Sequence, residues 1–83
     1  MQTSVDKITA EIGRTLGYTP EQVPVFVDAE TAAQVLGIKC NTLTNWRSTG
    51  RYALPFVKTG RLVRYRVSDL AEWIAQRRAS GEV

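Results

Sequence analysis

The sequence of 83 residues lacks histidine altogether and contains a single cysteine, Cys40. A disulfide within the chain is therefore excluded, and so are zinc sites of the usual Cys/His kind. No apolar run approaches the roughly 18 residues that a membrane-spanning helix needs. Acidic residues interrupt the apolar positions near the N-terminus, where a signal peptide would have a continuous apolar core. These absences predict a cytoplasmic protein with no membrane segment and no structural metal.

The residue patterns that enzymes use are also missing. The sequence has no histidine, no pair of carboxylates set among apolar residues, and no phosphate-binding loop of the glycine–lysine form. A chain of this length buries only roughly two-thirds of the surface that it exposes when unfolded, which leaves little room for an enclosed catalytic pocket. We therefore expect one small domain that is not an enzyme and binds no cofactor.

Acidic residues are absent from one continuous stretch, residues 39–66. This stretch holds seven of the eleven basic residues, whereas all eight acidic residues lie outside it, so the net charge of +3 hides a strong segregation. Such segregation is typical of a surface that binds a polyanion. A solvated basic face would have the same composition, so the charge alone does not decide between the two interpretations.

The first 24 residues are expected to form a helical extension. Apolar residues recur there at helical spacing, with Ser4 as the expected N-cap and Gly17 as the expected C-cap. A capping-box pattern, with Thr19 as N-cap and Gln22 three residues later, predicts a further helical turn. The apolar set of the helix is Val5, Ile8, Ile12 and Leu16.

Two short helices separated by a glycine are predicted after a short β-type run, Val25–Val27. Asp28 is a suitable N-cap for the first helix, and Gly37 ends it. The second helix is predicted from about Cys40 to Ser48, before Gly50. This layout is typical of a helix-turn-helix. The apolar contacts between the two helices are expected from Ala33, Ile38, Leu43 and Trp46.

The apolar period changes to two after Pro55, which predicts a β-hairpin around the turn Thr59-Gly60-Arg61. One face of the hairpin is expected to carry Phe56 with Val63 or Tyr65. The opposite face is expected to present the basic residues Lys58, Arg64 and Arg66.

A final helix is predicted after the hairpin, with Ser68 as its N-cap. Its inward stripe is expected to consist of Leu70, Trp73 and Ile74. Trp46, Tyr65 and Trp73 are interpreted as core residues, because they alternate with aliphatic residues at helical or strand spacing. Tyr52 is expected to be partly exposed.

This order of elements, together with a set of residues at characteristic positions within it, is typical of a known family. The residues are Ala32-Ala33, Leu36-Gly37-Ile38, Thr42-Leu43, Trp46-Arg47, Gly50, Leu54-Pro55, Val57-Lys58, Gly60-Arg61, Arg64-Tyr65, Ser68-Asp69-Leu70 and Trp73-Ile74. From Phe26 to Arg78 the chain resembles the MerR-like winged helix-turn-helix family, in its short excisionase and AlpA-type branch. The resemblance implies a mainly α fold with a small β-hairpin wing. It also implies a DNA-binding domain over residues 25–79, preceded by the extension of residues 1–24 and followed by a tail of residues 80–83.

The resemblance implies that the second helix of the motif enters the major groove of double-stranded DNA and that the wing contacts phosphates or the minor groove. Asn41 and Asn45 are suited to reading adenine, unless Asn41 caps the helix instead. The family commonly has a serine as N-cap of this helix, where this sequence has Lys39. The candidate residues of the helix are Lys39, Cys40, Asn41, Thr42, Thr44, Asn45, Arg47 and Ser48. Those of the wing are Lys58, Thr59, Arg61, Arg64 and Arg66, of which Arg64 and Arg66 have ion pairs with Asp69 or Glu72 as an alternative.

The resemblance implies an excision factor or a small transcriptional regulator of a mobile element. Its partners would be double-stranded DNA, further copies of the chain on that DNA, and a recombinase. A phage DNA-packaging subunit with the same winged module is an alternative. A protein-interaction module that kept the fold is another, but it requires an apolar outer face on the second helix. The residues there are Asn41, Thr44, Asn45 and Ser48, which favours DNA.

Overall fold

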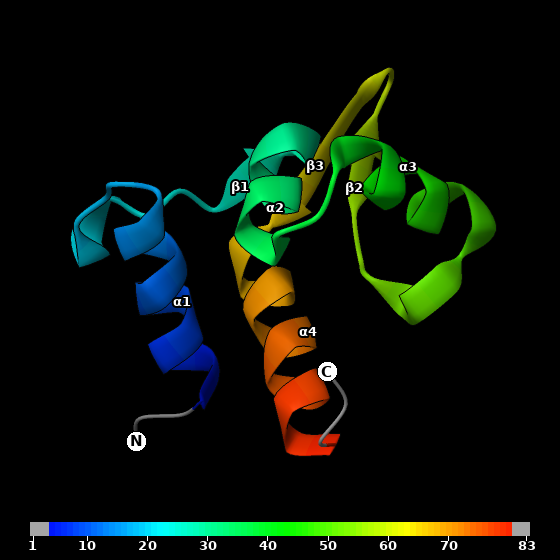
Figure 1. The fold of residues 1–83 in the computed structure, drawn as a ribbon. Coiled ribbons are helices and arrows are strands. Elements are labelled where there is room, and N and C mark those ends of the chain that lie inside the picture. The colour runs from blue at the N-terminus through cyan, green and yellow to red at the C-terminus, as the bar shows by residue number, and fades with distance from the viewer. Residues whose placement is uncertain (1–3, 81–83) are drawn as a thin grey trace.

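The computed structural model of the protein describes residues 4–80, which form helices, two single turns of 3₁₀-helix and three short strands (Figure 1). In chain order the elements are α1 (Ser4–Thr15), η1 (Pro20–Gln22), β1 (Phe26–Asp28), α2 (Ala29–Leu36), α3 (Cys40–Thr49), η2 (Arg51–Ala53), β2 (Val57–Thr59), β3 (Leu62–Arg66) and α4 (Val67–Ser80). The mainly helical fold with a small hairpin is confirmed. The predicted tail of residues 80–83 lies outside the described residues except for Ser80.

The three strands form one antiparallel sheet with β3 in the centre, between β1 and β2. The run predicted at Val25–Val27 is therefore the third strand of the wing sheet rather than a mere lead into the next helix. Val27 of β1 lies opposite Tyr65 of β3. This pairing attaches the start of α2, which follows β1 directly, to the base of the hairpin.

The hairpin register places Lys58 on a different face from the predicted one. Lys58 pairs with Val63, and residues directly opposite each other in an antiparallel pair share a face. Lys58 therefore lies on the side of Val63 and Tyr65, and the prediction that it shares a face with Arg64 is wrong. The reason is the turn, which consists of Gly60 and Arg61 only, because Thr59 belongs to β2 and pairs with Leu62.

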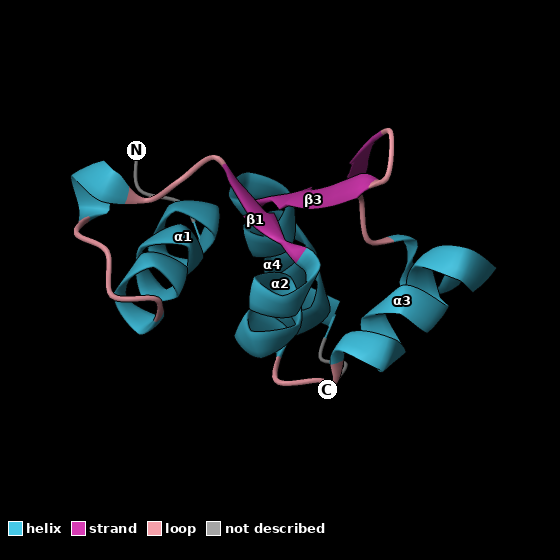
Figure 2. Ribbon diagram, turned by 90° about the horizontal axis from the view of Figure 1, so that it is seen from above, coloured by secondary structure: helices cyan, strands magenta, loops and turns pink. Residues whose placement is uncertain are grey.

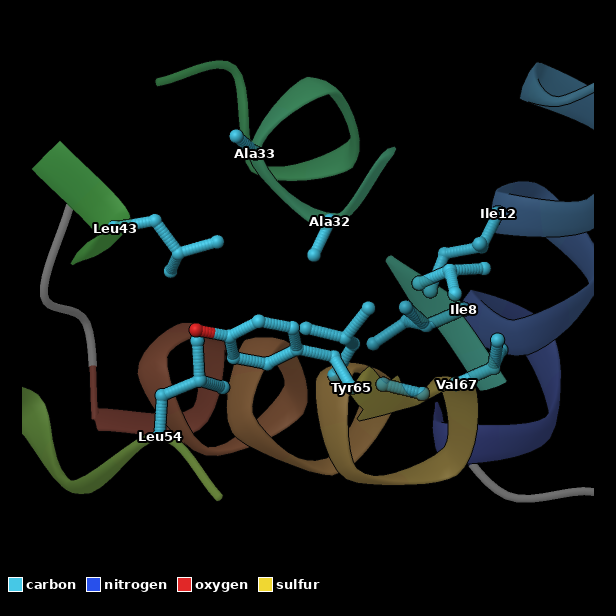
Figure 3. Close-up of a cluster of buried hydrophobic side chains, with 11 residues drawn as sticks. Ile8, Ile12, Ala32, Ala33, Leu43, Leu54, Tyr65 and Val67 are labelled. Carbon is cyan, nitrogen blue, oxygen red and sulfur yellow. The ribbon is translucent and has the colours of Figure 1, made fainter. Parts of the chain in front are cut away.

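The core lies where α1, α2, α4 and the inner face of the sheet meet. Ile8 and Ile12 of α1 point toward Ala32 and Val67, and Leu43 of α3 approaches Tyr65 from the other side (Figure 3). Helix α1 packs along α4. Its apolar face is thus part of the same core as the residues of the motif. The buried residues are Ile8, Ile12, Val27, Ala32, Ala33, Leu43, Leu54, Tyr65, Val67, Leu70 and Ala71.

The helix ends of the motif agree with the sequence. The Asp28 carboxylate accepts a hydrogen bond from the backbone N–H of Thr31 at 2.8 Å, which confirms the N-cap of α2. Gly37 and Gly50 both have a φ of 71° at the C-terminal ends of α2 and α3. This left-handed conformation is accessible to glycine without a steric cost, so each glycine ends its helix as predicted.

Two of the expected N-caps, Ser4 and Ser68, are wrong. Ser4 lies within α1 instead of capping it. Thr19, by contrast, is the N-cap of η1 as predicted, although its side chain makes no capping bond and the turn that it begins is a single 3₁₀ turn. Ser68 lies inside α4, which begins at Val67 directly after β3. The backbone N–H of Val67 donates to the carbonyl of Val25 at 2.8 Å, so the residue before β1 satisfies the first N–H of α4.

Candidate nucleic-acid interface

Helix α3 begins one residue after Lys39, whose carbonyl accepts a hydrogen bond from the N–H of Leu43 at 3.2 Å. Lys39 is thus the N-cap, although its side chain makes no capping bond. The alternative start at Asn41 is wrong. Because Asn41 lies within the first turn, its amide is not needed as the helix cap.

The two sides of α3 differ completely in character. Leu43 is 1% exposed and fixes the inner side of the helix against the core. Cys40, Thr42 and Trp46 are half-buried along the borders. The outer side carries only polar, exposed residues, namely Asn41, Thr44, Asn45 and Ser48. Lys39 is exposed next to this row. A helix with such an outer face offers hydrogen-bond donors and acceptors to a partner rather than apolar surface.

Arg47 connects α3 to the hairpin, a contact that the sequence analysis missed. Its Nη1 donates a hydrogen bond to the Tyr65 hydroxyl at 3.1 Å. Its guanidinium carbon lies 5.8 Å from the centre of the Phe56 ring. Tyr65 itself is buried and 6.4 Å from Phe56, ring centre to ring centre. Arg47 therefore holds the wing at a defined position relative to α3. The only signal in the sequence was the aromatic pair on the inner face of the hairpin.

The tip of the wing is basic and open to solvent. Lys58, Thr59 and Arg61 are all exposed, and Arg61 occupies the two-residue turn together with Gly60. Gly60 has a φ of 61°, as tight hairpin turns require. Lys58 lies on the inner face of the hairpin, with Val63 and Tyr65. Arg61 projects from the end of both strands.

The two remaining arginines of the wing lie on its outer face and have partners within the protein. Arg66 Nη2 forms an ion pair with the Asp69 carboxylate at 3.0 Å, which is the alternative considered for this residue. The hydrogen bond to Asp69 raises the pKa of Arg66 above its ordinary value. Arg64 is half-buried, donates from Nη1 to the carbonyl of Val63 at 3.2 Å, and lies opposite Asp28 in the sheet.

The candidate residues gather at one end of the molecule. Helix α3 and the hairpin lie on one side of α2 and α4, and α1 lies on the other (Figure 2). Acidic residues are absent from residues 39–66, so the stretch that forms this end is purely basic. The fold thus gathers most of the basic residues at this end, with Asp69 paired with Arg66 and Asp28 opposite Arg64 at the base of the hairpin.

A helix-turn-helix whose second helix is flanked by a β-hairpin defines the winged helix-turn-helix class. A family model described as a helix-turn-helix domain matches residues 26–78. The chain belongs to this family and is a DNA-binding helix-turn-helix protein. A search of curated protein sequences found no match. Among residues 4–80, none of the helices has the length and apolar character to cross a membrane.

Proposed function

We propose that this protein binds double-stranded DNA in a sequence-specific manner and serves a mobile element as an excision factor or as a small transcriptional regulator. The observation that carries the proposal is the exposed polar face of α3 beside a basic hairpin. The major groove, about 12 Å wide, accepts one α-helix and presents a distinct pattern of donors and acceptors for each base pair. A polar row on α3 suits that groove.

Asn41 and Asn45 are the residues that would read the sequence. They are both exposed and lie four residues apart, so they share one face of the helix. An amide side chain can donate to N7 and accept from N6 of adenine at once, a contact worth about 1–3 kcal/mol of discrimination. Lys39, at the N-terminal end of α3, would contact guanine or a phosphate. The remaining residues of α3 that would face the bases are Cys40, Thr44 and Ser48.

The hairpin would supply contacts that do not depend on sequence. Lys58, Thr59 and Arg61 would contact phosphates or a narrow minor groove, with Arg61 inserted deepest. Arg66 is paired with Asp69, but its side chain is 51% exposed. An exposed ion pair contributes little stability, so Arg66 would exchange Asp69 for a phosphate at small cost. Arg64, on the outer face of the wing, would add a phosphate contact, and Arg47 and Thr42 would do so from α3.

One copy of the protein would bind weakly. Roughly six phosphate contacts correspond to a slope near −5 in a plot of log K against log salt concentration, and to a short footprint. Useful occupancy of a DNA site therefore requires several copies side by side, or a DNA-bound recombinase as a partner. This requirement fits both proposed roles, excision and regulation.

The proposal is tested by titrating the protein onto labelled duplex DNA at two salt concentrations. The site is first selected from random duplexes by the wild-type protein. We expect Arg61→Ala to weaken binding to every duplex and to reduce the salt slope by about one. We expect Asn45→Ala to weaken binding only to the selected site, by about 1–3 kcal/mol. Arg14→Ala removes a charge from an exposed position on α1 and serves as the control.

No binding of the wild-type protein at low salt would refute the proposed function. Binding without any sequence preference would refute only the reading of bases by α3, and an equal loss for Arg61→Ala and Arg14→Ala would remove the wing from the interface. Excision and regulation are then separated in cells that carry the element, by measuring its excision and the activity of its promoters with and without the protein.

A further inference from the structure

The loop between α3 and β2 has an unusual backbone. Tyr52 has a φ of 63° and Ala53 a φ of 50°, and one residue, Arg51, separates them from Gly50 with its φ of 71°. Residues with a Cβ rarely adopt this left-handed conformation, because the Cβ atom lies too close to the following carbonyl oxygen. Two such residues in succession persist only when the surrounding structure holds them, and such sites often have a functional role.

Side chains of two other helices hold this loop. Trp73 Nε1 and Arg77 Nη2 of α4 both donate hydrogen bonds to the carbonyl oxygen of Tyr52, at 2.8 and 3.1 Å. From α3, the Trp46 ring lies 4.7 Å from the Tyr52 ring, centre to centre, in an edge-on arrangement. The Arg77 guanidinium lies 4.5 Å from the centre of the Trp73 ring. The loop is therefore rigidly positioned at the C-terminal end of α3.

This arrangement presents an aromatic ring and guanidinium groups at the surface. Tyr52 is 47% exposed, so the contacts that hold the loop do not hide its ring. The guanidinium carbon of Arg51, itself an exposed residue, lies 5.5 Å from the centre of that ring. A guanidinium stacked on an aromatic ring has already lost side-chain freedom before a phosphate binds. The N–H groups in its plane remain available to donate hydrogen bonds to that phosphate.

The loop adjoins the DNA interface proposed above. A hollow of about 360 Å³ is lined by Arg51 and Ala53 of this loop and also by Arg47 and Phe56. Arg51 and Arg47 thus border the same depression, at the junction of α3 and the hairpin. Helix α3 has ten residues and is about 15 Å long, slightly more than the width of the major groove, about 12 Å. Residues just past its end are within reach of a phosphate backbone.

We propose that Arg51, held over the ring of Tyr52, forms a third contact of this protein with the DNA backbone, in addition to α3 and the wing. The contact joins the guanidinium of Arg51 to a phosphate beside the C-terminal end of α3. Tyr52 acts as a positioning residue, and so does Arg77 through the carbonyl of Tyr52. The inference rests on the proposed function, because it assumes that α3 faces DNA.

The test uses Arg51→Ala in the full chain, with Arg14→Ala as a control of equal charge at the far end of the molecule. We expect Arg51→Ala to weaken binding about five- to tenfold on every duplex and to reduce the salt slope by about one, because one phosphate contact is lost. Its melting temperature should stay close to that of the wild type, since Arg51 is exposed and has no buried partner to lose.

A second variant, Tyr52→Gly, tests the positioning of Arg51. Glycine accepts the left-handed backbone without strain, so the loop keeps its path while the ring is removed. We expect Tyr52→Gly to reproduce most of the loss caused by Arg51→Ala. The double variant should be little weaker than Arg51→Ala alone, because both changes remove the same contact.

The outcomes separate this inference from the proposed function. If the wild-type protein binds and Arg61→Ala weakens it, but Arg51→Ala behaves like Arg14→Ala, the third contact is refuted and the proposed function stands. Fully additive losses in the double variant, or wild-type affinity for Tyr52→Gly, would refute the role of the ring. If the wild-type protein does not bind DNA, the proposed function itself fails.

Discussion

The two ends of this molecule differ in how far their apolar side chains are buried. At one end, α1 packs along α4, and Ile8 and Ile12 are only 3% and 4% exposed. At the other end, the hairpin leaves Val57 and Leu62 exposed to 42% and 56%. The first end gains stability from buried apolar surface. The second has the shape of a two-stranded arm that projects beyond the core (Figure 1).

This difference shows how a small domain combines a buried apolar core at one end with an exposed hairpin at the other. Isolated hairpins are marginally stable in water, so a projecting wing needs support from the rest of the fold. The support comes from β1, which pairs with the base of β3, and from Arg47, which contacts Tyr65 and Phe56. Because the basic tip is exposed and the hairpin is supported at its base, the residues at the tip contribute little to the stability of the fold.

The largest expected effect tests the stable end. Ile12→Ala should lower the free energy of unfolding by about 2–4 kcal/mol, because it opens a cavity between α1 and the rest of the core. The affinity for DNA, measured where the variant is still folded, should not change. Urea denaturation gives the first quantity, with Glu11→Ala as an exposed control on the same helix. Unchanged stability would mean that α1 is separable from the core and available to join copies of the protein.

An intermediate effect is expected at the boundary between the two ends. Tyr65→Phe removes the hydroxyl that accepts the hydrogen bond from Arg47, and should cost about 1 kcal/mol of stability. Because Tyr65 is buried, any loss of DNA affinity in this variant must be transmitted through Arg47 and the hairpin. Thermal unfolding and DNA titration measure the two effects. Tyr18→Phe, at an exposed tyrosine, is the control. An equal response of both variants would contradict a connecting role for Arg47.

A further effect, about as large on stability but confined to one helix end, concerns the cap of α2. Asp28→Ala should lower the free energy of unfolding by about 1 kcal/mol at neutral pH. The hydrogen bond from the backbone N–H of Thr31 holds the pKa of Asp28 below its ordinary value of 3.8. The folded state therefore favours the ionised carboxylate, and this stabilisation is present above about pH 4 and is lost as the pH falls through the lower folded-state pKa.

The difference in stability between the wild type and Asp28→Ala should accordingly shrink in acid. Denaturation at several pH values measures it, and Asp28→Asn, which keeps an acceptor for the cap, should lose less at neutral pH. A difference that is the same at pH 7 and pH 2.5 would show that the charge of Asp28 plays no part in capping α2.

Local signals in the sequence were sufficient for the order of the elements. Asp28, Gly37 and Gly50 mark the helix ends of the motif, because a capping side chain or a left-handed glycine acts within a few residues of itself. The apolar residues of α1, α2 and α4 were predicted by periodicity for the same reason. The polar outer side of α3 also follows from spacing, once Leu43 is taken as the inner residue.

Other features depend on contacts between segments that are distant in the sequence. The pairing of β1 with β3 decides that the wing has three strands, and the length of the turn at Gly60 decides that Lys58 lies on the inner face. A shift of one residue in the pairing of two strands moves every side chain of a strand to the opposite face of the sheet. Periodicity alone could therefore not fix this register. The start of α4 likewise involves a distant residue, because the N–H of Val67 donates to the carbonyl of Val25.

By itself, the sequence determined where the main helices lie, where the motif turns, and that residues 39–66 carry seven basic residues and no acidic one, because propensity, capping and composition are local properties. Only the tertiary structure decided that Arg47 is attached to the hairpin, that Arg66 is paired with Asp69, and that α4 holds Tyr52 in a left-handed loop. These contacts join residues brought together by the packing of α3, α4 and the sheet. Their geometry exists only once the core has formed.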